Sequence, residues 1–194
     1  TVHRAVHTSI VTALIGGVLV AVFGQLIAAG LMGLLNVPDD VYPLALAYLR
    51  IYLLGMPVIL LYNFEAAIFR SVGDTKVPLI ALTVSGVLNV ILNLFFVIVC
   101  KLDVAGVALA STIAQCVSAG LILHALTKVS DCYALDFRKV RLALNMTKRI
   151  LMLGVPAGLQ NAIFAIANLF IQAGVNSFDS LMVKGNSAAA NADA

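Results

Sequence analysis

The sequence predicts an all-α fold, a polytopic bundle of membrane-spanning helices. Hydrophobic residues make up 62% of the chain and charged residues only 11%, whereas soluble domains are about 45–50% apolar and about 25% charged. Several apolar segments exceed the roughly 20 residues that an α-helix needs to cross a bilayer. Lysine and arginine gather in alternate connectors between these segments, as in multi-pass membrane proteins.

Five apolar segments qualify as spans, and all but one of their connectors are short. They cover approximately residues 8–35, 41–69, 77–100, 104–127 and 150–178, and a sixth begins near Leu181. The chain starts at Thr1 without an initiator Met and stops at NSAAANADA, within an opening apolar segment. We therefore expect an internal piece of a longer protein, which should not transport anything by itself.

The basic residues predict an orientation. If the N-terminal end is cytoplasmic, the inner connectors hold nine lysines and arginines and the outer ones hold two, Lys101 and Lys184. The inner set comprises Arg4, Arg70, Lys76, Lys128, Arg138, Lys139, Arg141, Lys148 and Arg149. Positive charge collects on the cytoplasmic side, so we expect a multi-pass protein of the cell inner (cytoplasmic) membrane with this orientation.

The long basic connector at 128–149 predicts the domain organisation. Its stretch LDFRKVRLAL is weakly amphipathic and suits the cytoplasmic membrane surface. We expect four spans in 1–127, the connector in 128–149, and a second bundle beginning in 150–194.

Polar side chains line one face of the third and fourth segments. Asn89 and Asn93 lie one helical turn apart, and Ser111 and Gln115 repeat that spacing on the next segment. Counting ~1.5 Å per residue from the short turn between the segments, we expect Asn93 opposite Ser111 and Asn89 opposite Gln115. Two interpretations stay open: hydrogen bonds that pack neighbouring membrane helices, and a cation or substrate site.

The second segment contains a proline, and an acidic residue follows it. Pro57 removes one backbone hydrogen bond and predicts a kink, and Tyr62 and Asn63 follow. Glu65 is the only carboxylate within an apolar segment. We expect it to lie near the interface, paired with a nearby Arg or Lys; a proton relay is the alternative.

The fifth segment repeats this combination of a proline with embedded amides. Pro156 predicts a second kink, and the amides are Gln160, Asn161, Asn168 and Gln172. Bent helices lined with amides are typical of a transporter cavity. We expect a neutral, amide-rich substrate cavity that also includes Tyr62 and Asn63.

The sequence has no nucleotide-binding loop, no metal-ligand cluster and no nucleophile–base pair. We therefore expect neither an enzyme nor an ATP-driven pump, and no cofactor, no metal and no nucleic-acid partner. The expected partners are the lipid bilayer and small cationic or amphipathic solutes.

Six stretches of the chain resemble the multidrug and toxin extrusion (MATE) family. They are AYLRIYLLGMPVILLYN, FRSVGDTKVPL, LNVILNLFFVI, DVAGVALAS, LGVPAGLQNAIFAIANLFIQ and VNSFDS. The resemblance covers nearly the whole chain in the right order, and the Arg-Ser-Val-Gly-Asp-Thr-Lys hairpin is its most specific part.

The resemblance implies a twelve-helix, two-lobe parent protein, of which this chain holds helices three to seven and the start of the eighth. It implies a secondary antiporter, monomeric as a whole, that exports cationic lipophilic compounds in exchange for sodium ions or protons. The family's cation site maps onto Asn89, Asn93 and Ser111, with Tyr48 near the same pocket.

Two departures from the family pattern concern ion coupling. Asn93 stands where relatives carry an aspartate, so this position cannot carry a proton. The seventh-helix glutamate of another branch has no counterpart around Phe164.

Two other functions are alternatives. A lipid-linked oligosaccharide flippase would need more interior arginine to bind phosphate. A structural membrane subunit would explain the amides as packing contacts between helices.

Overall fold

The computed structural model describes residues 2–34, 42–129 and 143–176. Within these ranges the chain is helical apart from short turns, which confirms the predicted all-α class. The chain divides into two compact units, Thr1–Thr147 and Lys148–Ala194, and each is described by itself. Most of the connector at 128–149, and the sixth segment near Leu181, lie outside the described residues.

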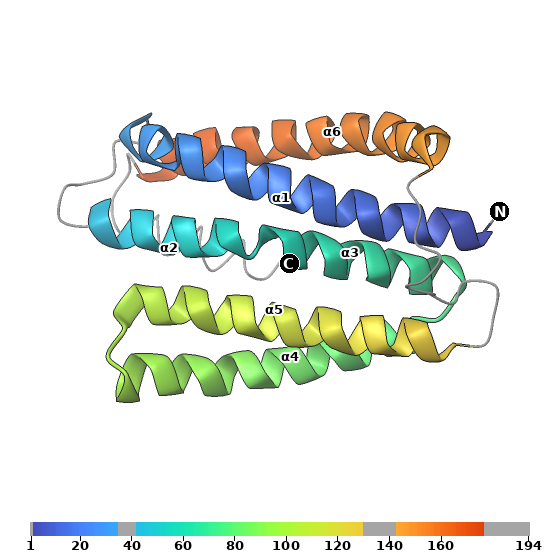
Figure 1. Ribbon diagram of the computed structural model, residues 1–194. Coiled ribbons are helices and arrows are strands. Elements are labelled where there is room, and N and C mark those ends of the chain that lie inside the picture. Colours follow the sequence, from blue (N-terminus) through green and yellow to red (C-terminus); the bar gives the residue numbers. More distant parts are fainter. Residues whose placement is uncertain (1, 35–41, 130–142, 177–194) are drawn as a thin grey trace. The chain divides into compact units, whose positions relative to one another are not determined.

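The first unit contains five α-helices and one π-helix, labelled in Figure 1. In chain order they are α1 (Val2–Leu34), α2 (Tyr42–Leu54), α3 (Met56–Ser71), α4 (Lys76–Leu94), the π-helix η1 (Phe95–Val99) and α5 (Asp103–Lys128). The helix α6 (Leu144–Asn176) lies almost wholly in the second unit. It begins six residues before the segment that the sequence predicts.

The second predicted span is broken at Gly55. Its two halves, α2 and α3, meet at an angle of 47°. The Gly55 N–H donates to the Tyr52 carbonyl at 3.0 Å and closes α2. Pro57 lies in the first turn of α3, where its missing N–H removes no intrahelical bond. The proline therefore opens a new helix at the bend.

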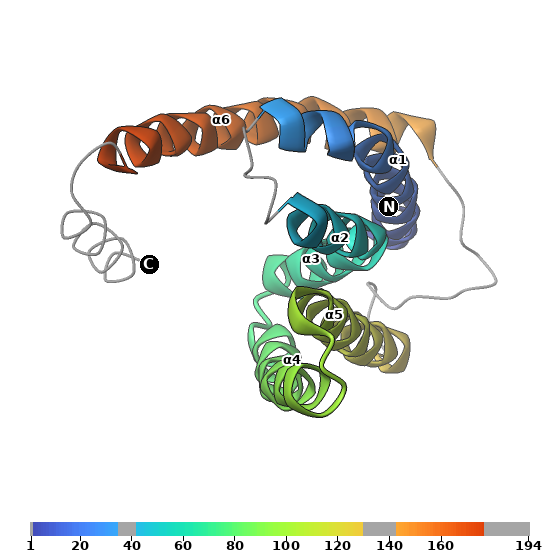
Figure 2. The same ribbon diagram turned by 90° about the vertical axis from the view of Figure 1, so that its left-hand side faces the viewer.

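The helices of the first unit pack in the order α1, α2 with α3, α5, and α4 (Figures 1 and 2). α1 approaches α3 closely at Gly17, where a Cβ atom would lie 2.3 Å from the Pro57 Cα. A Cβ on Gly55 would lie 3.1 Å from the Thr112 Oγ1 of α5. Small residues let membrane helices approach closely, and these two contacts fix the registers of α1 and α5 against α3.

The turn between α3 and α4 has the residues that its backbone needs. Gly73 has φ +83°, a conformation that glycine adopts without strain. The Asp74 Oδ1 accepts the Lys76 N–H at 2.9 Å and the Val77 N–H at 3.4 Å, and it thereby caps α4. Gly73 and Asp74 thus let the chain reverse between α3 and α4.

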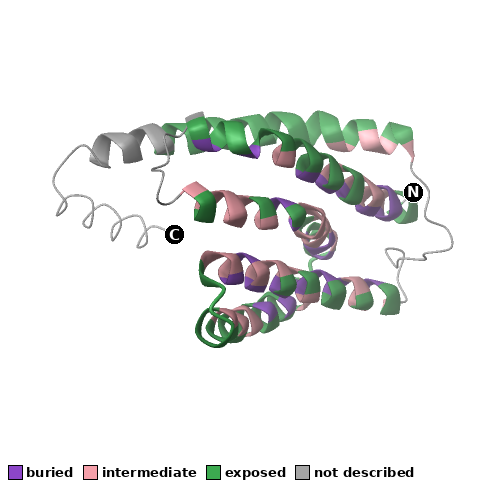
Figure 3. Cartoon of the chain, turned by 60° about the vertical axis from the view of Figure 1, so that its left-hand side comes forward, coloured by how far each residue is buried: buried purple, intermediate pink, exposed green. Residues whose placement is uncertain are grey.

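Apolar side chains face both the interior and the exterior of the first unit. A buried cluster joins four helices at the end where α3 and α5 terminate, and it comprises Val6, Ile10, Ala66, Phe69, Ala81, Ile122 and Leu126. Figure 3 shows buried residues along the facing sides of the helices. Large apolar residues such as Leu79 and Ile98 are exposed outward, which suits a lipid environment.

Helix length and composition agree with membrane insertion. Among the described residues, four helices are long and apolar enough to cross a membrane, and the count is five if α2 and α3 form one bent span. α6 runs through Pro156 as one helix, and its side chains from residue 151 to 168 are exposed.

Candidate functional site

A cluster of uncharged polar side chains joins α4 to α5. The Asn93 Nδ2 donates to the Asn89 Oδ1 at 2.8 Å, and the Asn89 Nδ2 donates to the Ser111 Oγ at 3.2 Å. Asn89 and Asn93 share one face of α4 because they lie four residues apart. The structure thus brings together three of the four residues predicted for the cation site.

The register between the two helices differs from the expected one by one turn. Asn89, and not Asn93, lies against Ser111, so the predicted pairs Asn93–Ser111 and Asn89–Gln115 are wrong. The expectation assumed α-helical rise up to Cys100, but residues 95–99 form a π-helix. A π-turn holds more residues than an α-turn, so residues 95–99 shorten the outer end of α4 by less than one turn and account for part of the difference.

Two buried oxygen atoms in this region have no hydrogen-bond partner among the described residues. They are the Asn93 Oδ1 and the Gln115 Oε1. Gln115 lies one turn from Ser111 on α5, and that spacing of four is the sequence signal that could have placed it among the predicted ligands. Buried polar atoms are usually paired, so these two carbonyl oxygens keep the capacity to bind a cation or a water molecule.

The cluster offers only neutral amide and hydroxyl groups to a ligand. Amide and hydroxyl oxygens coordinate hard cations, and carbonyl oxygens coordinate sodium ions in other transporters. None of these groups ionises near neutral pH. The cluster can therefore bind a cation but cannot exchange a proton.

Tyr48, the fourth predicted residue, has a different neighbour. Its ring stacks on that of Tyr52 one turn along α2, with ring centroids 6.1 Å apart and planes inclined by 8°. No hydrogen bond joins Tyr48 to Asn89, Asn93 or Ser111 within the ranges that the structure describes.

The residues predicted for the substrate cavity lie in both units. In the first unit Tyr62 is half-buried, and the exposed Asn63 donates its Nδ2 to the Ile59 carbonyl at 2.8 Å. In the second unit Gln160, Asn161 and Asn168 are exposed on α6. Gln172 belongs to the same helix, and its side chain lies outside the described residues.

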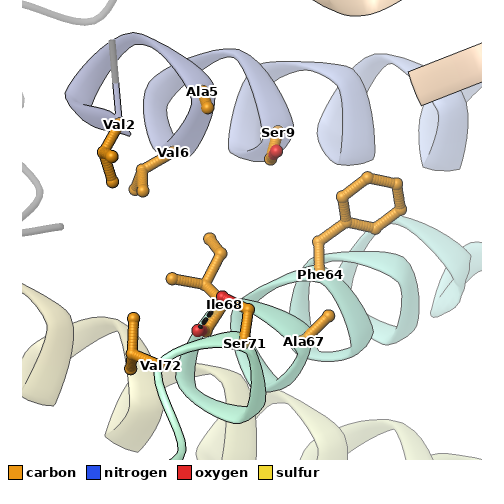
Figure 4. A pocket seen from close by; sticks show the side chains of 9 residues that line it. All are labelled: Val2, Ala5, Val6, Ser9, Phe64, Ala67, Ile68, Ser71 and Val72. Carbon is orange, nitrogen blue, oxygen red and sulfur yellow. Dashed lines mark hydrogen bonds between the residues drawn. The ribbon is translucent and has the colours of Figure 1, made fainter. Parts of the chain in front are cut away.

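A groove of about 340 Å³ lies between the start of α1 and the end of α3 (Figure 4). Its lining is apolar apart from Ser9 and Ser71, and Ser71 donates its hydroxyl to the Ile68 carbonyl at 2.7 Å. No predicted cavity residue lines this groove. The groove carries no charged group that would recognise a cationic solute.

Glu65 does not lie at an interface with a basic partner. It is 0% exposed, and neither carboxylate oxygen has a hydrogen-bond partner among the described residues. Arg70 instead donates its Nε to the Ala66 carbonyl at 3.2 Å. The expected pairing with Arg or Lys is therefore wrong, because the helix face of Glu65 turns into the bundle.

Comparison with known proteins agrees with this architecture. The MatE family model matches residues 1–95. The chain is 32% identical to the probable multidrug resistance protein YpnP of Bacillus subtilis over 80% of its own length and 34% of the relative's. It is 27% identical to the multidrug export protein MepA of Staphylococcus saprophyticus, with coverage of 84% and 36%.

A solved structure has a similar fold. An inward-facing multidrug resistance MATE family transporter of the MOP superfamily aligns with a TM-score of 0.77 and 26% identity, over 88% of this chain and 39% of that one. The chain spans about a third of the length of the curated relatives it matches. With its apolar helices, bent second span and family match, this multi-pass membrane protein belongs to the MatE family of transporters.

Proposed function

We propose that this protein is a secondary active antiporter that exports cationic, lipophilic compounds in exchange for sodium ions or protons. The observation that carries the proposal is the polar cluster on α4 and α5. Its three residues form one hydrogen-bonded chain across two helices, and the Asn93 Oδ1 at its end is buried and has no partner within the described part of the chain. Polar groups embedded in a membrane mark ion and substrate pathways.

In this proposal the cluster is the sodium site. Asn89, Asn93, Ser111 and Gln115 supply neutral oxygens, and the ion supplies the charge that the site lacks. Transport relatives named for multidrug resistance and export support the substrate class. The substrate cavity predicted from Tyr62, Asn63 and the amides of α6 belongs to the same proposal. The proposal also includes an inner-membrane location, a cytoplasmic N-terminal end and a monomeric transporter.

The test is ethidium efflux from proteoliposomes that contain the protein expressed from its complete gene. Efflux is measured with an inward sodium gradient, an inward proton gradient, or neither. We expect gradient-driven efflux by the wild type. Asn89→Ala should raise the sodium concentration needed for half-maximal efflux, because it removes both hydrogen bonds of the cluster and one ligand.

The matched control is Thr83→Ala. Thr83 lies on the same helix, but its hydroxyl donates to the Leu79 carbonyl of that helix at 2.9 Å and joins no neighbour. It should leave efflux unchanged. If Asn89→Ala behaves like Thr83→Ala, the cluster is packing and not an ion site. If the wild type exports ethidium under neither gradient, the antiport proposal fails.

A further inference from the structure

Glu65 is a buried carboxyl group that the proposed sodium site does not use. It lies on α3 with 0% exposure, and both of its oxygens lack a partner among the described residues. An unpaired carboxylate removed from water is strongly disfavoured, and such a group carries a proton instead. The described spans contain no other carboxyl group beyond the first turn of a helix.

Two further unpaired polar groups lie near Glu65 in depth. They are the Thr12 Oγ1 on α1 and the Ser118 Oγ on α5, and both atoms are buried without a hydrogen-bond partner in the described ranges. Counting from the Gly17–Pro57 contact, Thr12 and Glu65 lie within about one helical turn of each other along the bundle axis. Counting from the Gly55–Thr112 contact, Ser118 lies within about 6 Å of the level of Glu65.

These three groups come from the three helices α1, α3 and α5, of which α3 packs against both others. Buried hydroxyl and carboxyl groups without protein partners are the usual ligands of internal water. The Thr12 and Ser118 hydroxyls and the Glu65 carboxyl group are therefore the polar groups that an internal water would bond to at this level.

The buried apolar cluster separates this polar layer from the nearby helix ends. Phe69 follows Glu65 by one turn on α3, and Ile122 and Leu126 follow Ser118 on α5. All three are no more than 1% exposed. Beyond them lie the exposed basic residues Arg70 and Lys128. In this conformation Glu65 has no exposed surface, and the apolar cluster lies between it and those helix ends.

No titratable group on the surrounding helices neutralises Glu65 by an ion pair or hydrogen bond within the described ranges. His7 on α1 is buried, and its Nδ1 contacts the His3 carbonyl. The remaining titratable groups on α1 to α5 are His3, Arg4, Tyr42, Tyr48, Arg50, Tyr52, Tyr62, Arg70, Lys76, Asp103, Cys116, His124 and Lys128.

We propose that Glu65 is the proton-binding site of the transport cycle, closed from water here by the apolar cluster. When α1, α3 and α5 separate at this end, the carboxyl O–H bond breaks and a water molecule takes the proton. The bond forms again when the carboxylate takes a proton from hydronium on the other side. This inference rests on the proposed antiport function and assigns its proton to a residue away from the amide cluster.

The experiment measures protons and transport in the same protein. Ethidium is added to the purified full-length protein in weakly buffered detergent solution, and a pH-sensitive dye reports proton release. Ethidium efflux from proteoliposomes is followed in parallel. The variants are Glu65→Gln, Glu65→Asp and Asp103→Asn. Asp103 is an exposed acid with φ +44° at the start of α5, a conformation that asparagine tolerates.

We expect the wild type, Glu65→Asp and Asp103→Asn to release protons on ethidium addition, and Glu65→Gln to lose that release. Glu65→Gln should also lose efflux driven by a proton gradient while still binding ethidium, which shows that it is folded. If the wild type transports and Glu65→Gln releases protons as the wild type does, the inference is overturned and the antiport function stands. If the wild type exports no ethidium under any gradient, the antiport function itself fails, and the inference fails with it.

Discussion

Asn89 is the residue on which the polar cluster depends. It accepts a hydrogen bond from Asn93 and donates one to Ser111, so it joins a contact within one helix to a contact between two helices. Its neighbours on α4 are apolar and largely exposed. The amide therefore fixes the rotation of α4 about its axis, because turning the helix would move Asn89 towards lipid.

Alanine substitutions at Asn89 and Ser111, singly and together, measure this contact. Interhelical hydrogen bonds in membrane proteins are worth about 0.6 kcal/mol on average and up to about 1.7 kcal/mol. We expect a coupling energy in that range from the unfolding free energies of the four proteins. The pair Thr83 and Ser111 is the control and should show no coupling energy. A coupling energy of zero between Asn89 and Ser111 would contradict the hydrogen bond between them.

At the scale of elements, the register between α4 and α5 places Asn89 against Ser111. Disulfide trapping tests this register directly. The double variant Asn89→Cys/Ser111→Cys should cross-link rapidly with a mild oxidant, because these side chains are in contact. The double variant Asn93→Cys/Ser111→Cys should cross-link more slowly, since Asn93 lies one turn further along. If Asn93→Cys/Ser111→Cys cross-links faster than Asn89→Cys/Ser111→Cys, the register is the one that the sequence predicts, with Asn93 opposite Ser111.

The approach of α1 to α3 supports a second prediction at this scale. Gly17→Ala places a methyl group 2.3 Å from the Pro57 Cα, so one of the helices must move. Overpacking of this kind costs about 1–3 kcal/mol, and thermal unfolding in detergent should show the loss. Gly30→Ala is the matched control, since a Cβ there meets nothing within 4 Å. It should leave stability unchanged or raise it by up to about 1 kcal/mol through helix propensity.

At the scale of the whole molecule, the distribution of basic residues predicts the orientation. The natural Cys100, exposed beside the turn at Lys101, provides a probe of the predicted outer side. With Cys116 and Cys132 replaced by serine, a membrane-impermeant maleimide should label Cys100 in intact cells. In a cysteine-free protein, Asp74→Cys should be labelled only after permeabilisation. The opposite pattern would reverse the orientation.

The sequence alone determined the class of the protein and the order of its spans. Composition and segment length indicate whether a helix lies in lipid or in water, because crossing a bilayer requires about 20 apolar residues per span. Helical periodicity placed Asn89 and Asn93 on one face of α4, and Ser111 and Gln115 on one face of α5. The turn at Gly73 and Asp74 was also predictable, since it depends on neighbouring residues.

Only the tertiary structure decided which of these side chains meet. Asn89, and not Asn93, donates to Ser111, and the π-helix that shortens the end of α4 has no local signal in the sequence. Glu65 was expected beside a basic residue. It is instead buried between α1, α3 and α5, and its carboxyl oxygens have no hydrogen-bond partner among the residues that the structure describes. Periodicity is a property of one helix, whereas register and burial depend on how several helices fit together.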